Sequence, residues 1–200
     1  MGEKIDGVGR VLGFLDSPYY VEDDVMGVDF EGFSKQTEDV YNNFVKGGEL
    51  EEDVVGGKCG AAYVNEEWKC LFGQFRFPFI ESEYLLVADQ FDGWQLSHDI
   101  HGFDGIEAEP EYTKEEVEAV EEFGKKQNAL LGTLGGRVWA SACYAHHVSE
   151  DDDGFLELKN SEGLSQKDAL VDMLGGGEGG RRGEWVDEVG AFECCCVDKY

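Results

Sequence analysis

Two residues that could do chemistry each follow a predicted strand. Asp92 lies shortly after the apolar run 84–88, and His146 comes directly after the strand candidate 137–143. Because α/β enzymes gather reactive groups at the carboxyl edge of parallel strands, we expect both side chains at one edge of a sheet. Each residue taken alone is more often an ordinary loop residue. Together, an acid followed by a histidine has the order found in α/β hydrolases that use a Ser-His-Asp triad.

In that chemistry the histidine takes the proton of a serine that attacks an ester carbonyl, and it returns the proton to the leaving alcohol. The acid orients the imidazole and stabilises the imidazolium. The serine usually lies earlier in the chain, in a G-x-S-x-G turn, and no such motif occurs here. Ser17 follows Asp16 and precedes Pro18, without flanking glycines, and is expected to end a strand. We therefore predict that the nucleophile lies outside this chain.

Strand and helix candidates alternate along the chain and would position these groups. Strands are predicted at 8–15, 84–88, 137–143 and 155–159. Helices are predicted at 35–46, from 113 to 131, and from 165 onward. The second helix begins with a capping box at Thr113, and the third with Ser165 followed by Asp168. The glycine-rich stretch 175–183 is predicted to be a loop. This alternation predicts an α/β fold with a parallel sheet.

The composition limits the classes of partner. The chain has 200 residues, 42% of them apolar, which is enough to bury the core of one domain. With 44 acidic and 16 basic residues the formal net charge is -28, so the protein repels polyanions at low ionic strength. Nucleic acid and anionic membranes are therefore not expected as partners. The apolar runs are far shorter than the ~20 residues of a membrane-spanning helix. The first residues do not form a signal peptide, so an export signal would lie upstream.

Cysteine and histidine do not form a recognisable metal motif. The histidines show no CxxC or HExxH framework, and they are His98, His101, His146 and His147. We predict neither a metal nor a cofactor. The six cysteines fit either disulfides or buried thiols, and their pairing cannot be read from the sequence. They are Cys59, Cys70, Cys143, Cys194, Cys195 and Cys196.

Several segments resemble one enzyme family. The stretch EWKCLFGQFRFPFIESEYLLVADQFDGWQLS resembles the part of pectin acetylesterases and Notum in which a Cys-aromatic segment leads through a strand into an Asp-x-x-Gln turn. SACYAHHV resembles the Cys-x-x-His segment of that family, and LDSPYY resembles its Asp-Ser-Gly-aromatic segment, with Pro18 where glycine is usual. LSQKDALVDML and GEWVDEVGAFECCC are similar to the closing helix, Trp segment and Cys-containing tail.

The resemblance implies roles for individual residues. Asp92 matches the catalytic acid of the family, and His146 rather than His147 matches the catalytic histidine. Cys59, Cys70 and Cys143 would be structural disulfide cysteines, while the partners of 194–196 stay open. The implied fold is an α/β-hydrolase-like parallel sheet flanked by helices, from which the N-terminal strands and the nucleophile turn are missing. Residues 1–200 would be the C-terminal part of one pectin acetylesterase-like domain.

The implied function is that of a carboxylic ester hydrolase. It would remove an acetyl or other acyl group from a cell-wall polysaccharide or a related substrate, and it would act outside the cell. Pectin is itself a polyanion, so neutral acetylated glycans fit the charge at least as well. Two alternatives remain. One is a truncated, non-catalytic relative that acts as an acidic interaction protein. The other is an unrelated acidic binding domain in which the cysteines 194–196 are reactive or bind metal.

Overall fold

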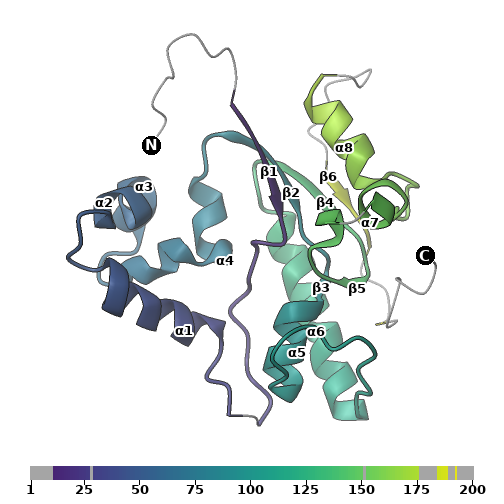
Figure 1. Cartoon of the computed structure of the whole chain (residues 1–200), viewed down its shortest axis with the longest axis horizontal. Helices are drawn as coiled ribbons and strands as arrows, with labels where there is room; N and C mark the ends of the chain where they lie inside the picture. Colours follow the sequence, from purple (N-terminus) through teal and green to yellow (C-terminus); the bar gives the residue numbers. More distant parts are fainter. Residues whose placement is uncertain (1–10, 28, 151, 176–183, 189–191, 193–200) are drawn as a thin grey trace.

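A parallel sheet forms the centre of the molecule. The computed structural model describes residues 11–27, 29–150, 152–175, 184–188 and 192. Within them the sheet has the order β1-β2-β4-β6, and every neighbouring pair is parallel. Its strands are β1 (Leu12–Asp16), β2 (Glu83–Val87), β4 (Arg137–Ala140) and β6 (Glu184–Val186). The predicted parallel sheet is confirmed, and Figure 1 shows helices on both of its faces.

The apolar run of β2 is buried on both sides. Leu85 and Leu86 are both fully buried, yet they belong to different core clusters because neighbouring strand residues point to opposite faces. On one face Leu86 packs with residues of α5 (Gly93–His101) and α6 (Lys114–Leu131). On the other face Leu85 packs with residues of α8 (Gln166–Met173). Such double coverage explains why the sequence of β2 is continuously apolar rather than alternating.

The two helix starts with capping signals are confirmed. Thr113 and Ser165 each accept a hydrogen bond from the third backbone N–H of the helix, and the acidic side chain at that position bonds back to the cap. Helix α1 (Phe33–Val40) continues as a π-helix (Tyr41–Val45), so the helix predicted at 35–46 is present. Its predicted apolar face is only partly buried, since Tyr41 is covered whereas Phe44 is 83% exposed.

The strand predicted at 155–159 is wrong. Residues Asp152–Leu156 form helix α7, which Glu157 extends by donating its backbone N–H to the carbonyl of Asp153. Acidic residues at the start of a helix interact favourably with its dipole, and the acidic residues here, Asp152 and Asp153, lie in that first turn. What remains of the predicted strand is one antiparallel bridge between Lys159 and Ser165.

The segment between α1 and the sheet forms a smaller helical region. It contains α2 (Glu51–Val55), α3 (Gly57–Ala62), α4 (Gly73–Arg76) and two 3-10 segments, Glu67–Leu71 and Phe77–Phe79. Figure 1 shows α1, α2 and α3 on the side of the molecule away from α8. A disulfide joins Cys59 to Cys70 at the centre of this region, and Cys143 is also disulfide-bonded. The cysteines 194–196, and the predicted loop beyond Gly175 up to 183, lie outside the described residues.

Candidate active site

A second, very short pair of strands brings the two predicted residues together. β3 (Phe91–Asp92) pairs in parallel with β5 (Tyr144–Ala145), and the register places Asp92 opposite Ala145. β3 follows the end of β2, and β5 follows the end of β4. His146 comes directly after Ala145, so both side chains lie beyond the carboxyl edge of the sheet, as the sequence predicted.

Asp92 and His146 contact each other directly. The distance between Asp92 Oδ2 and His146 Nδ1 is 2.7 Å, and the two side chains are 5% and 2% exposed. An acceptor at Nδ1 favours the tautomer that carries its proton on this nitrogen and leaves Nε2 as the basic site. The contact that the sequence predicted is therefore confirmed, while the catalytic roles of the two residues stay predictions.

The other carboxylate oxygen of Asp92 caps a helix. Its Oδ1 accepts a hydrogen bond of 2.8 Å from the backbone N–H of Gln95, which makes Asp92 the N-cap of α5. This bond satisfies one of the free N–H groups at the helix start, and the helix dipole favours a negative charge there. The carboxylate is thus fixed by a helix on one side and holds the imidazole on the other.

Gln95, the last residue of the Asp-x-x-Gln motif, binds the backbone of Val21. Its Oε1 accepts from the backbone N–H of Val21 at 3.0 Å, and its Nε2 donates to the carbonyl of Val21 at 2.5 Å. The same Nε2 lies 3.0 Å from Asp99 Oδ2. The buried amide therefore ties the chain that follows β1 to the helix that Asp92 caps.

The environment of His146 favours its charged form. Burial lowers the pKa of the imidazole, but the hydrogen bond to Asp92 and the charges of Asp92, Asp16 and Asp89 outweigh it. The pKa of His146 consequently lies above the ordinary value of 6.5. A base with a raised pKa accepts a proton more readily, although a larger fraction of it is already protonated near neutral pH.

Asp89 is a residue of this site that sequence reasoning missed. It follows β2, is 1% exposed, and accepts a hydrogen bond from Ser141 Oγ through Oδ1. Its Oδ2 has no hydrogen-bond partner within the described part of the chain. Burial raises the pKa of Asp89 to about 7, with further increases from the charges of Asp92 and Asp16. The one sequence signal for Asp89 is its position shortly after the buried strand β2. Asp92 follows the same strand.

Aromatic rings surround the imidazole. The indole of Trp94 stacks on His146 with ring centroids 5.9 Å apart and an interplanar angle of 28°. The rings of Tyr20 and His147 lie at 6.5 Å and 4.0 Å from it. Burial first, and the nearby charge of Asp92 second, raise the pKa of Tyr20, so this phenol stays neutral. These rings shield the contact between Asp92 and His146 from water.

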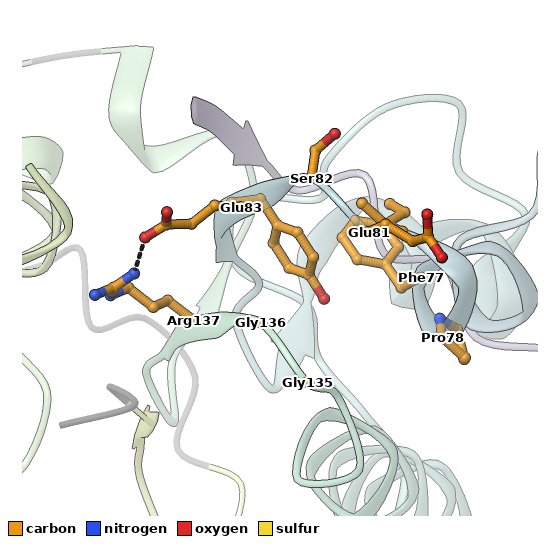
Figure 2. A pocket seen from close by; sticks show the side chains of 10 residues that line it. Phe77, Pro78, Glu81, Ser82, Glu83, Gly135, Gly136 and Arg137 are labelled. Atoms are coloured by element: carbon orange, nitrogen blue, oxygen red, sulfur yellow. Dashed lines mark hydrogen bonds and ion pairs between the residues drawn. The ribbon is translucent and has the colours of Figure 1, made fainter. Parts of the chain in front are cut away.

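A separate pocket of about 410 Å³ lies at the opposite edge of the sheet. Residues around the start of β2 and β4 line it, among them Glu83, Gly135, Gly136 and Arg137, and Figure 2 shows the ion pair between Glu83 and Arg137 in its wall. Because Asp92 and His146 lie at the carboxyl ends of the strands, we do not assign this pocket to the candidate site. Across the described ranges, no group of three or more His, Cys, Asp or Glu side chains is arranged to hold a metal ion. No described helix is long and apolar enough to cross a membrane.

Comparisons with known proteins agree with this architecture. The model of the family described as pectinacetylesterase matches residues 4–174. The Wnt deacylase Notum from Drosophila, in one crystal form, superposes with a TM-score of 0.69 at 19% identity, covering 94% of this chain and 48% of that chain. A second crystal form gives a TM-score of 0.65 at 20% identity, with 82% and 43% covered. A search of curated proteins yields no match.

The chain therefore spans about half the length of these solved structures. At such low identity the likeness shows the fold alone. The predicted α/β-hydrolase-like architecture, a parallel sheet flanked by helices, is confirmed by it.

Proposed function

Because the chain belongs to the pectinacetylesterase family, we propose that it forms the C-terminal part of a carboxylic ester hydrolase with a Ser-His-Asp mechanism. His146 is the general base, Asp92 orients it, and the nucleophilic serine lies outside this chain. The observation that carries the proposal is the 2.7 Å contact between Asp92 Oδ2 and His146 Nδ1 beyond the carboxyl edge of the sheet. We further propose that the 200 residues are part of a single domain.

The geometry supports separate roles for His146 and Asp92. With Nδ1 bound to Asp92, Nε2 of His146 accepts the serine proton as the serine oxygen bonds to the ester carbonyl carbon. The same proton then passes to the alcohol oxygen as the bond between that oxygen and the acyl carbon breaks. Water then gives a proton to Nε2 as its oxygen bonds to the acyl carbon, and the proton passes to the serine oxygen as the bond between that oxygen and the acyl carbon breaks, which releases the acid. Asp92 orients the imidazole and stabilises the imidazolium that forms between the steps.

Shielding of the imidazole constrains how a substrate reaches it. The His146 side chain is 2% exposed and is surrounded by the rings of Trp94, Tyr20 and His147. Access of a serine and an ester to Nε2 therefore requires a local rearrangement around the imidazole. Low exposure of the reacting groups also strengthens their electrostatic interactions, because water screens them less.

The substrate class follows from the family and from charge. We propose an acyl ester of a carbohydrate or related hydroxyl compound, reached outside the cell. The formal charge of -28 opposes the approach of a polyanion such as pectin at low ionic strength. This penalty shrinks as the screening length falls to about 8 Å near physiological salt. Neutral acetylated glycans therefore fit at least as well as pectin.

The test uses this chain joined to its upstream coding sequence, which we call the extended protein. The substrate is nitrophenyl acetate. His146→Ala and Asp92→Asn should each lower kcat by at least about 100-fold, because they remove the base or its orienting acceptor. His101→Ala, at the far end of α5, is the matched control and should retain activity. Equal activity of wild type, His146→Ala and Asp92→Asn would refute the proposed mechanism.

The absence of a G-x-S-x-G motif from the sequence favours a second candidate, an acidic interaction protein without catalysis. The two proposals differ in what the extended protein does, since the interaction protein would show no turnover. For the 200-residue chain alone we expect no turnover under either proposal, because the nucleophile and its oxyanion donors are the parts that lower the barrier most. Turnover by the pure chain, blocked by a serine-directed phosphonate, would contradict the assignment of the nucleophile to a position outside it.

A further inference from the structure

We infer that Asp16 and Ser17 are positioning residues, which hold His146 against Asp92 by binding the backbone directly after the histidine. The inference deepens the proposed function, because it takes His146 to be the base. The contacts that carry it are independent of that function. It also gives a role to the LDSPYY segment, which contributes no reacting group to the mechanism above.

The two residues bind the segment that follows His146. Ser17 Oγ accepts a hydrogen bond from the backbone N–H of His147 at 3.0 Å. Asp16 Oδ2 accepts from both the backbone N–H and the Oγ of Ser149, at 3.1 Å and 2.5 Å. These partners are 130 and 133 positions apart in the sequence, so the contacts are formed only in the folded protein. We call this set of three hydrogen bonds the histidine clamp.

The clamp is anchored to the sheet. Asp16 is the last residue of β1 and lies opposite Val87 in the pairing with β2. The backbone N–H of Ser17 continues this ladder by donating to the carbonyl of Val87 at 2.9 Å. Ser17 Oγ also donates to Asp16 Oδ1 at 2.9 Å, which joins the two clamp side chains to each other. The rigid end of the central strands therefore sets the position of the clamp.

Backbone strain lies on both sides of the clamp. Ser17 and His147 both have a φ of 55°, in the left-handed region that non-glycine residues rarely adopt. Such a conformation is energetically unfavourable and persists where surrounding contacts enforce it. Here the strained backbone of His147 donates to the side chain of the strained Ser17. The left-handed turn at His147 directs the chain away immediately after the candidate base.

Position of the imidazole depends on this backbone. β5 is only a two-residue strand, and the next element is the 3-10 turn Val148–Glu150. Besides its bond to Asp92 and the ring contacts described above, His146 is therefore positioned through its covalent neighbours. A displacement of about 1 Å in a catalytic group can lower a rate by about 100-fold. The clamp limits such displacement through the backbone that follows His146.

The decisive experiment follows the Nδ1–H proton of His146 by NMR in this 200-residue chain. Ser17→Ala removes the acceptor for His147, and Ser149→Ala removes one of the bonds to Asp16. In each variant we expect this proton to exchange with water roughly tenfold faster, about the effect of losing one hydrogen bond. The exposed Ser82→Ala is the matched control and should leave the exchange rate unchanged.

Further variants separate position from charge. Asp16→Asn keeps an oxygen acceptor but removes a charge that raises the pKa of His146, so the pKa should fall while exchange stays slow. Ser17→Asn supplies another side-chain acceptor in a residue that tolerates positive φ, and it should restore slow exchange relative to Ser17→Ala. Wild-type exchange in both Ser17→Ala and Ser149→Ala would overturn the inference. If Ser17→Ala does not fold, Ser149→Ala decides alone.

Activity of the extended protein tests the two proposals separately. Ser17→Ala should lower kcat by roughly 10- to 100-fold with little change in KM, since a residue that acts only by positioning the base affects the chemical step rather than binding. An extended protein with no esterase activity refutes the proposed function, and the exchange measurements still decide the clamp. Faster exchange with an unchanged kcat would overturn the positioning role.

Discussion

The side-chain amide of Gln95 pairs with the backbone of Val21 as a neighbouring strand would. Its oxygen accepts from the N–H at 3.0 Å and its nitrogen donates to the carbonyl at 2.5 Å. Val21 is fully buried, so neither of its backbone groups has access to water. The chain leaving β1 is thereby fixed to α5, and the histidine clamp and Asp92 are held in one frame.

Replacing Gln95 should lower the free energy of unfolding, because its side chain binds two buried backbone groups. In Gln95→Leu the buried N–H and carbonyl of Val21 lose their partners, at a cost of about 1–3 kcal/mol each. We expect the free energy of unfolding, measured with urea, to fall by about 3 kcal/mol. Gln36→Leu, at an exposed position on α1, is the control. Equal effects of the two substitutions would show that the amide pairing contributes nothing.

The pKa of His146 is a direct test of its contact with Asp92. We expect an NMR titration of this chain to place it above 6.5, and Asp92→Asn to lower it by removing both the hydrogen bond and the charge. Because the folded pKa is raised, the stabilisation from this pair is complete below pH 6.5 and is lost as pH rises through the folded pKa. In the extended enzyme, activity should rise with pH through the same pKa, since the base must be neutral to accept a proton.

An imidazole pKa at or below 6.5 would mean that burial dominates over the three carboxylates around it. His101→Ala serves as the assignment control, because it removes a different imidazole signal and should leave the His146 titration unchanged. A titration of His146 that does not respond to Asp92→Asn would contradict the hydrogen bond itself.

Asp89 should make the protein less stable as pH rises. Its folded pKa of about 7 lies above the ordinary 3.8, so the folded state binds a proton that the unfolded state has already lost between these values. Stability from this group is present below about pH 4 and is lost as pH rises through 7. Asp89→Asn should remove this loss, and at pH 8 it should raise the free energy of unfolding by on the order of 1 kcal/mol or more.

Asp89→Asn should also lower the pKa of His146, because the charge of Asp89 is one of those that raise it. Asp24→Asn, at an exposed position, is the control for both measurements. Unfolding curves of wild type and Asp89→Asn that change in parallel between pH 5 and 8 would show that this carboxyl is not the source of the pH dependence.

Elements with a strong local signal could be predicted from the sequence. β2 has a continuous apolar run, and α6 has a capping box, so their residues encode them without reference to distant segments. The contact between Asp92 and His146 was also predictable, because each follows a strand of a parallel sheet. The family resemblance then distinguished His146 from His147.

Features that depend on distant partners could not be predicted. β3 and β5 have two residues each and exist only because they pair with each other. β6 likewise has three residues and follows a glycine-rich stretch. The alternation at 155–159 fits a strand, yet the preceding acidic residues start a helix there. The burial of Asp89 and the clamp at Ser17 arise from tertiary packing, which cannot be predicted from the local sequence.

Close packing at the amino edge of the sheet predicts that alanine substitutions at two adjacent glycines, Gly135 and Gly136, change the free energy of unfolding by different amounts. A Cβ on Gly136 would overlap the ring of Tyr84, which is 3% exposed, whereas a Cβ on Gly135 would have open space around it. Figure 2 shows both glycines at the wall of the pocket there. Gly136→Ala should therefore lower the free energy of unfolding by about 1–3 kcal/mol through overpacking.

Gly135→Ala is the matched control, because it adds the same methyl group one residue earlier. It should be neutral or stabilise the protein by up to about 1 kcal/mol, since alanine reduces the freedom of the unfolded chain and neither glycine has a positive φ. Combining Gly136→Ala with Tyr84→Leu should cost less than the sum of the two, because the smaller side chain makes room for the added methyl. Urea unfolding measures the wild type and the four variants. Additive costs in the double variant, or equal effects at the two glycines, would show that the ring of Tyr84 does not restrict this position.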